Sequence, residues 1–147
     1  MPVTLAEMEA LIGRQFPGGK VSVPRWQSFL LTDVMCFPQL DENMIHPAAA
    51  FNIPLDGMGM TYQELFDLCH AESPDAVRAG EYDFQFHDQL REETEYQVQG
   101  EIVDVRRKTG ARSGTFDLVT FELRLSDPDG RATLTATNTW VFMRSET

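Results

Sequence analysis

The C-terminal half of the chain alternates between apolar and polar residues, which is the period of a β-strand with one buried face. Four runs follow this pattern: Tyr82 to Phe86, Tyr96 to Val105, Phe116 to Leu125 and Leu134 to Phe142. The alternation slips near Val103, which predicts a β-bulge in the second run. The sequence Asp-Pro-Asp-Gly at positions 127–130 predicts a turn before the last strand, because glycine readily adopts positive φ. We therefore expect an antiparallel sheet over residues 81–144.

The N-terminal half repeats its apolar residues at helical spacing. Thr4 and Glu7 form a capping box, which predicts a short first helix. A second helix is expected to begin near Pro24, since proline is tolerated in the first turn. Its apolar side chains recur three or four residues apart: Trp26, Phe29, Leu30, Val34 and Phe37. Residues 1 to about 38 are thus predicted to be largely helical, and a loop follows over residues 39–60.

A third helix is predicted over residues 61–71. It begins at a second capping box, formed by Thr61 and Glu64. Apolar side chains cover nearly its whole circumference: Tyr62, Leu65, Phe66, Leu68 and Cys69. A helix that is apolar almost all round is normally enclosed by other elements. The whole pattern therefore indicates an α+β protein, in which a curved antiparallel sheet wraps around one long central helix.

The composition excludes several classes of partner. The chain has 147 residues, a length typical of one domain (1–147), and carries 12 Lys and Arg against 23 Asp and Glu, a net charge of −11. Nucleic acid is not expected as a partner, because binding it requires a basic surface that displaces counterions from phosphates. No apolar stretch approaches the ~20 residues that cross a bilayer, and no secretory signal is visible. We therefore expect a cytoplasmic protein without a membrane partner.

Neither a metal nor a cofactor is expected. The three histidines are scattered and form no metal-binding spacing with one another or with cysteine. Cys36 and Cys69 lie far apart, and in a reducing cytoplasm we expect both to be free, buried thiols. His70 is expected to stabilise the end of the central helix, where a cation favours the helix dipole. His87 is expected at the surface, at the end of a strand.

The densest cluster of potentially reactive side chains lies in the loop from Asp41 to His46. An aspartate and a histidine five positions apart can converge on one water, which the carboxylate orients and with which the imidazole exchanges a proton near neutral pH. Just downstream, Gly57 to Thr61 presents backbone amides at the start of the central helix. These N–H groups and the helix dipole could stabilise the enolate that develops from a thioester carbonyl.

This region resembles the signature of the MaoC-like, or (R)-specific enoyl-CoA hydratase, family of the hotdog superfamily. That signature runs Asp-x-Asn-Pro-(Leu/Ile/Val)-His, followed by an Ala-rich stretch, an aromatic residue, Pro-(Ile/Leu) and a glycine that opens the central helix. The matching positions are Asp41, Asn43, Ile45, His46, Ala48-Ala49-Ala50-Phe51, Pro54-Leu55 and Gly57. Met44 replaces the proline of the motif, and the segment from His46 to Gly57 is shorter than is usual in the family. The resemblance covers roughly residues 21–144.

The resemblance implies a hotdog fold and a hydratase or dehydratase, a lyase that adds water or a related nucleophile to an α,β-unsaturated acyl thioester. The thioester would be carried on CoA or acyl carrier protein. Asp41 would activate water or accept a proton, His46 would exchange a proton with Cα, and Gly57 or Gly59 would supply the oxyanion amide. Further residues would contact the substrate: Asn43, Met58 and Met60. A homodimer is expected, or a heteromer of hotdog subunits.

Two other functions stay open at this point. Glu64 lies one turn into the central helix, where hotdog thioesterases keep a catalytic carboxylate, although the capping box equally explains it. A catalytically degenerate hotdog subunit that works with an active partner is the third possibility. Arg107, Lys108 and Arg112 could bind a phosphate of the carrier, or could form a solvated hairpin end. Asn138, on an otherwise apolar strand face, is expected either at the sheet edge or in a buried polar contact near the pocket.

Overall fold

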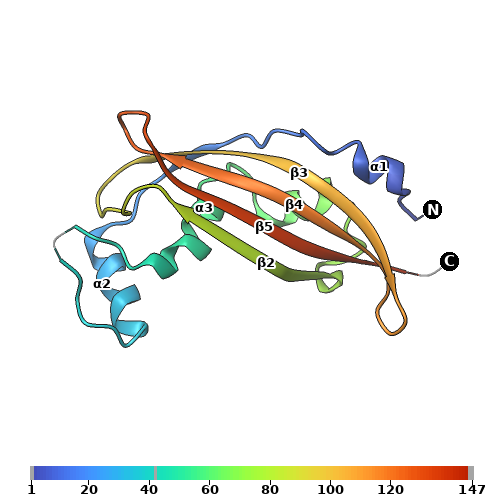
Figure 1. The fold of residues 1–147 in the computed structure, drawn as a ribbon, viewed down its shortest axis with the longest axis horizontal. Coiled ribbons are helices and arrows are strands. Elements are labelled where there is room, and N and C mark those ends of the chain that lie inside the picture. The colour runs from blue at the N-terminus through green and yellow to red at the C-terminus, as the bar shows by residue number, and fades with distance from the viewer. Residues whose placement is uncertain (1, 42, 146–147) are drawn as a thin grey trace.

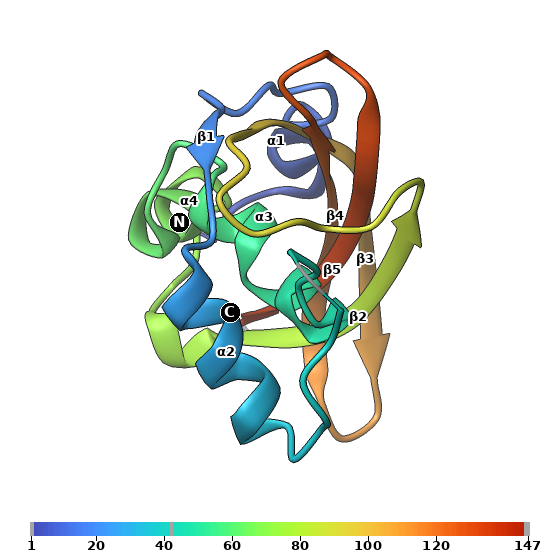
Figure 2. The same ribbon diagram turned by 90° about the vertical axis from the view of Figure 1, so that its left-hand side faces the viewer.

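One antiparallel sheet forms the body of the computed structural model, which describes residues 2–41 and 43–145 (Figures 1 and 2). The strands are β1 (Gly19–Val21), β2 (Val77–Phe86), β3 (Tyr96–Gly110), β4 (Gly114–Ser126) and β5 (Ala132–Arg144). They lie in the order β1-β3-β4-β5-β2, so that β1 and β2 form the two edges. The bulge predicted in the second run is confirmed, since the register shifts between Ile102 and Asp104. The turn at positions 127–130 is also confirmed, with Gly130 at φ 81°.

The sheet is larger than the sequence predicted. β2 begins at Val77 rather than near residue 81, because a register shift after Ala79 allows the strand to continue past Gly80. β1 was not predicted, because Pro17, Gly18 and Gly19 have the composition of a turn. Three residue pairs with β3, rather than local propensity, hold β1 in place.

Short helical segments cover one face of the curved sheet. They are α1 (Leu5–Glu9), α2 (Arg25–Val34), the 3₁₀ segment η1 (Pro47–Phe51), α3 (Ile53–Asp56), α4 (Tyr62–Leu68) and a second 3₁₀ segment, η2 (Pro74–Ala76). Figure 2 shows the sheet curving around α3. The core between the two layers includes these fully buried side chains: Met58, Leu65, Cys69, Ile102, Val119, Phe121, Leu123 and Leu134.

The prediction of one long central helix over residues 61–71 is wrong. The helical layer is divided into separate short pieces, and α4 has seven residues, Tyr62–Leu68. Two left-handed residues cause the division: Gly59, at φ 82°, separates α3 from α4, and His70, at φ 51°, follows the end of α4. Leu65 and Cys69 are fully buried, whereas Tyr62 is 47% exposed. The described chain therefore encloses α4 on one side only.

The apolar stripe of α2 does not face the core. The residues that α2 buries are Ser28 and Thr32. Most of its large apolar side chains are exposed, while Leu31 is partly buried against the core. Cys36, just beyond the helix, is also exposed, which corrects the expectation of a buried thiol there. Cys69 is buried, and both cysteines are free, as expected.

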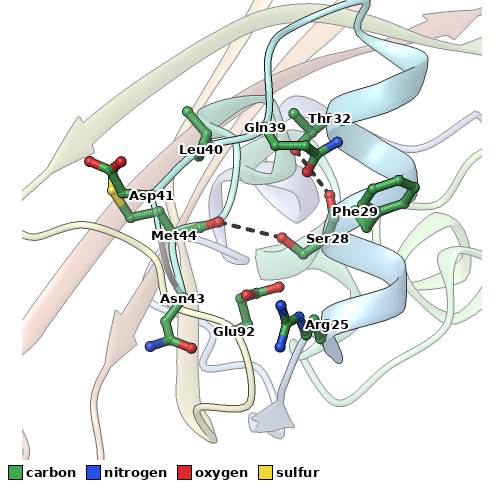
Figure 3. Close-up of a pocket in the computed structure, with 10 residues that line it drawn as sticks. All are labelled: Arg25, Ser28, Phe29, Thr32, Gln39, Leu40, Asp41, Asn43, Met44 and Glu92. Atoms are coloured by element: carbon green, nitrogen blue, oxygen red, sulfur yellow. Dashed lines mark hydrogen bonds between the residues drawn. The ribbon is translucent and has the colours of Figure 1, made fainter.

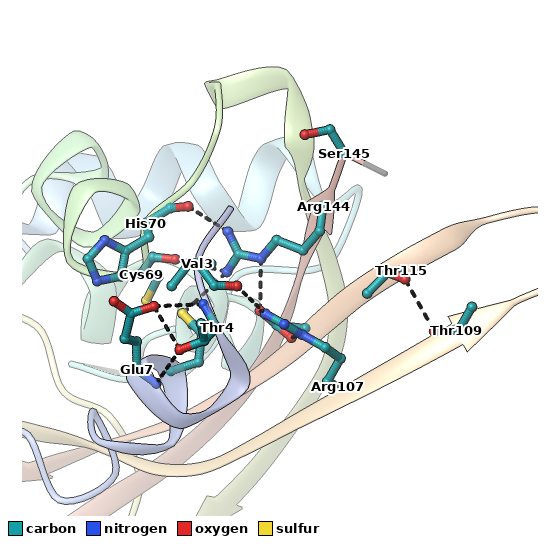
Figure 4. A network of polar contacts seen from close by, with 12 residues as sticks. Val3, Thr4, Glu7, Cys69, His70, Arg107, Thr109, Thr115, Arg144 and Ser145 are labelled. Atoms are coloured by element: carbon teal, nitrogen blue, oxygen red, sulfur yellow. Dashed lines mark hydrogen bonds and ion pairs between the residues drawn. The ribbon is translucent and has the colours of Figure 1, made fainter. Parts of the chain in front are cut away.

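A buried ionic network ties the ends of the chain together (Figure 4). The carboxylate of Asp117 on β4 is fully buried and accepts hydrogen bonds from Arg107 on β3 and Arg144 on β5, at 2.7 to 2.9 Å. Arg144 also donates to the carbonyl oxygens of Cys69 and His70 at the end of α4, and Arg107 donates to the carbonyl of Val3. The network thus joins the N-terminal segment, the helical layer and three strands.

In residues 2–41 and 43–145 no helix combines the length and the hydrophobicity needed to span a membrane. The same residues contain no group of three or more His, Cys, Asp or Glu placed to hold a metal ion.

Candidate active site

The loop from Asp41 to His46 has a defined shape because it is bonded to the loop that precedes β3. Ile45 donates its amide to the carbonyl of Leu90 at 2.9 Å, and Glu92 donates to the carbonyl of Asn43 at 2.8 Å. Asn43 adopts a left-handed backbone, φ 66°, which asparagine tolerates better than most residues. The motif residues are therefore held against a segment some fifty positions away in sequence.

His46 is half-buried and lies at the N-terminal end of η1. Its Nδ1 atom accepts a hydrogen bond from the amide of Ala48 at 3.1 Å, and its ring meets Phe37 edge-on at a centroid distance of 5.3 Å. Because Nδ1 is an acceptor, the proton of the neutral imidazole lies on Nε2. The structure therefore presents His46 as a hydrogen-bond donor through Nε2.

His46 lines a cavity of about 670 Å³. Most of the wall is apolar and consists of Phe37, Leu40, Met44, Ile45, Pro47, Phe86 and Leu90. Three polar residues, His87, Asp88 and Gln89, complete the wall beside His46. A large apolar cavity with a few polar groups is the usual form of a small-molecule site.

Asp41 lines a different, neighbouring cavity of about 400 Å³ between α2 and the loop (Figure 3). Its side chain is exposed and points away from Ser28 and Thr32. Leu40 and Met44 border both cavities. The structure thus brings Asp41 and His46 near the same two side chains but does not place them in one cavity.

Gly57 and Gly59 are required by packing. A β-carbon on Gly57 would lie 2.4 Å from Val98, and one on Gly59 would lie 2.1 Å from the carbonyl oxygen of Gly18. The amide of Gly57 donates to the carbonyl of Ile53 at 3.2 Å and so closes α3. Met58 lies between the two glycines and is completely buried in the core. Met60 follows Gly59 and packs against the core.

Glu64 is exposed, and its carboxylate serves the start of α4. Its Oε2 atom accepts from the amide of Thr61 at 2.7 Å and from the hydroxyl of Thr61 at 3.1 Å. The predicted capping box is therefore confirmed, and both contacts of this carboxylate are local.

The basic run does not form one site. Arg107 is bound to Asp117, while Lys108 and Arg112 are exposed near the hairpin that joins β3 to β4. Figure 1 shows this hairpin and the loop from Asp41 to His46 at opposite ends of the long axis. A carrier phosphate at the hairpin would lie far from the cavity of His46.

His87 and Asp88 enter the site unexpectedly. His87 is exposed, as predicted, but it borders the cavity, and its Nε2 lies 3.0 Å from the hydroxyl of Thr135. Asp88 is fixed by the amide of Gln89, which donates to its carboxylate at 2.7 Å. Local sequence patterns could not reveal these residues, because only the pairing of two distant loops brings them to His46.

Asn138 lies on the inner face of β5 and is buried rather than at the sheet edge. Its side-chain nitrogen and the indole nitrogen of Trp140 have no hydrogen-bond partner in the described part of the chain. Trp140 is surrounded by the rings of Tyr62, Phe66 and Phe121. Within the described residues, the side-chain nitrogen of Asn138 therefore lacks the polar contact that the sequence predicted.

Solved structures share this fold at low sequence identity. A MaoC-like dehydratase superposes with a TM-score of 0.72 at 17% identity, over 92% of this chain but 43% of the other. The HadBC (3R-hydroxyacyl-ACP dehydratase) complex from Mycobacterium tuberculosis gives 0.60 at 15% identity, over 86% and 92% of the chains. A hypothetical thioesterase protein from Streptococcus pneumoniae gives 0.54 at 12%, over 86% and 80%. The sequence matches no protein-family model and no curated protein. The chain therefore has the hotdog fold of MaoC-like structures, and at these identities the likeness establishes the fold alone.

Proposed function

We propose that this protein is a hotdog hydratase or dehydratase that acts on an α,β-unsaturated acyl thioester, or on the corresponding 3-hydroxyacyl thioester. The observation that carries the proposal is the position of His46 in the wall of a largely apolar cavity. The apolar wall suits an acyl chain, and the imidazole would lie beside the thioester. The motif from Asp41 to His46 and the dehydratases that share the fold support this assignment.

The contacts of His46 favour a role at the thioester oxygen. Hydration adds hydroxide to Cβ and a proton to Cα, and the intermediate charge collects on the oxygen of an enolate. The Nε2–H of His46 would donate a hydrogen bond to that oxygen. The sequence assigned this role to Gly57 or Gly59, and the amide of Gly57 is bonded to Ile53 instead. Direct proton transfer at Nε2 would require the ring to leave Ala48, because a doubly protonated imidazole has no acceptor for that amide.

A carboxylate must take the proton from the attacking water and deliver a proton to Cα. Asp41 holds the motif position for this role, and we assign the role to it. The assignment requires Leu40 and Met44, which border both cavities, to let the cavities join when substrate binds. Asp88, in the same cavity as His46, is the competing carboxylate.

The hydration of crotonyl-CoA tests the role of His46. The reaction is monitored by the loss of absorbance of the conjugated thioester. His46→Ala should lower kcat/KM by roughly 100- to 1000-fold, as the loss of one oxyanion donor does in other enzymes. His46→Gln retains an N–H donor and should recover part of this loss. Equal losses in the two variants would contradict the role at the oxygen and indicate proton transfer instead.

The same assay assigns the carboxylate. Asp41→Asn should abolish turnover, while Asp88→Asn and the control Asp129→Asn, in the turn between β4 and β5, should retain it. If Asp88→Asn abolished turnover and Asp41→Asn retained it, the catalytic role would belong to Asp88. Full turnover in both His46→Ala and Asp41→Asn, with the proteins folded, would refute the catalytic roles proposed for these two residues.

A second function, a hotdog subunit that is inactive alone, is favoured by two specific observations. Asp41 and His46 line different cavities, and the amide of Gly57 is already used inside α3. Among the structures that share the fold, HadBC is a complex. On this alternative the purified, folded chain would not hydrate crotonyl-CoA at all, and a hotdog partner would restore turnover.

A further inference from the structure

The exposed face of α2 departs from ordinary packing. Four large apolar residues lie on one face of this ten-residue helix: Trp26, Phe29, Leu30 and Val34. Trp26 is 66% exposed and Val34 is 75% exposed. Apolar residues spaced by three and four along a helix normally face the core, but here the small polar residues Ser28 and Thr32 occupy the buried side. Figure 3 shows Ser28 pointing toward Met44 while Phe29 points away from it.

The apolar face forms a ridge between two grooves. On one side, Leu30 and Val34 line a groove of about 260 Å³, whose far wall includes Ala49, Ile53 and Asp56. On the other side, Phe29 lines the cavity that contains Asp41. A ridge flanked by grooves is the surface on which a second helix packs. From Trp26 to Val34 the ridge is about 12 Å long at 1.5 Å per residue, which is two turns of a helix.

The charges around the ridge select the partner. Asp33 lies on the exposed side of α2, Asp56 borders one groove, and Asp41 and Glu92 border the other. Arg25 lines the groove that contains Asp41, and among the described residues no Lys or Arg lines the groove that contains Asp56. The whole chain also carries a net charge of −11. A second copy of the chain, an anionic carrier protein and an anionic membrane would therefore all be repelled from this face.

We infer that the α2 face is a docking site for a partner protein, which presents an amphipathic helix with basic residues beside its apolar side chains. The apolar side chains of that helix would cover Trp26, Leu30 and Val34, and its lysines or arginines would meet the carboxylates around the ridge. The inference does not rest on the proposed reaction, because Trp26, Leu30 and Val34 do not line the cavity of His46.

Binding of two designed peptides by isothermal titration calorimetry tests the inference. Both peptides, of roughly 18 residues so that a helix can form, carry leucines at helical spacing, and their polar face carries lysines in one and glutamates in the other. At low ionic strength the lysine peptide should bind the intact protein at least about tenfold more tightly than the glutamate peptide. The double variant Trp26→Gln/Leu30→Gln should lose at least about tenfold in affinity for the lysine peptide.

A matched control separates this face from general stickiness. Val103→Gln removes an exposed apolar side chain on β3, outside the ridge, and should leave the affinity unchanged. Equal affinity for both peptides, or no loss in the double variant, would overturn the inference. Self-association of the intact protein that the double variant abolishes, measured by analytical ultracentrifugation, would also overturn it by identifying the partner as a second copy. If the intact protein hydrates crotonyl-CoA, the double variant should hydrate it equally well. A failure of the docking inference is therefore distinct from a failure of the proposed reaction.

Discussion

Glu64 and Asp117 show that the partners of a carboxylate, more than its position in a motif, decide what it can do. The sequence suggested Glu64 as the catalytic acid of a thioesterase, but its carboxylate accepts hydrogen bonds from the amide and hydroxyl of Thr61. Asp117 has no recognisable motif, yet it is fully buried between two guanidinium groups. Glu64 caps the start of α4, and Asp117 holds together elements that are distant in sequence.

The capping role of Glu64 makes a residue-scale prediction. Glu64→Ala should lower the free energy of unfolding by about 0.5–1 kcal/mol, because the amide of Thr61 loses its acceptor. Glu64→Gln retains an oxygen acceptor and should lose less. Urea unfolding followed by circular dichroism measures both changes, and hydration of crotonyl-CoA should be unaffected. If Glu64→Gln instead abolished hydrolysis of a saturated acyl-CoA by a stable protein, the thioesterase alternative would replace the proposed function.

At the scale of elements, the division between α3 and α4 depends on backbone contacts that allow no side chain. Gly59 adopts φ 82°, and a β-carbon there would overlap the carbonyl oxygen of Gly18 beside β1. The segment between the two helices can therefore approach β1 closely, and this approach sets the position at which α4 begins.

Gly59→Ala should accordingly be much more destabilising than the same change at a glycine with nearly the same φ. Gly130, at φ 81°, provides the matched control, because nothing lies within 4 Å of the β-carbon that would be added there. Gly130→Ala should cost about 1–2 kcal/mol for the left-handed backbone alone. Gly59→Ala should cost at least about 2 kcal/mol more in urea unfolding at neutral pH. Equal losses would show that the backbone between α3 and α4 can shift to relieve the overlap.

The sequence predicted those elements whose cause is local. Both capping boxes, the four long strands and the bulge follow from neighbouring residues, and the structure confirms them. The burial of α2 was not predictable, because the spacing of Trp26 and Leu30 defines an apolar face without showing whether this chain or a partner covers it. Likewise, the pairing of the loops that brings His87 to His46 depends on contacts between distant segments. The motif from Asp41 to His46 predicted a site in this loop, but it did not predict that Asp41 and His46 line separate cavities.

At the scale of the whole molecule, the buried network couples the two ends of the chain to the sheet (Figure 4). Asp117 contacts Arg144 and Arg107. Arg144 donates to the carbonyls of Cys69 and His70 at the end of α4, and Arg107 donates to the carbonyl of Val3 in the N-terminal segment. Burial raises the pKa of Asp117, but the hydrogen bonds and charges of Arg107 and Arg144 outweigh it and leave the pKa below the ordinary 3.8. Because the pKa is lower in the folded state than in the unfolded state, ionised Asp117 stabilises the fold above the ordinary pKa.

This coupling predicts an acid-sensitive component of stability that belongs to the fold as a whole. At pH 7, Asp117→Asn should lower the free energy of unfolding by about 3–5 kcal/mol, because it leaves the buried guanidinium of Arg144 without its counter-charge. As the pH falls below about 4, the intact protein should lose stability faster than the variant, so the difference between them should narrow. Asp104→Asn is the control, since Asp104 pairs with Arg106 at the surface and should cost less than about 1 kcal/mol at any pH. Urea unfolding of the three proteins between pH 7 and pH 3 measures the effect. A difference between the intact protein and Asp117→Asn that stayed constant over this range would mean that the charge of Asp117 contributes nothing to holding the ends of the chain on the sheet.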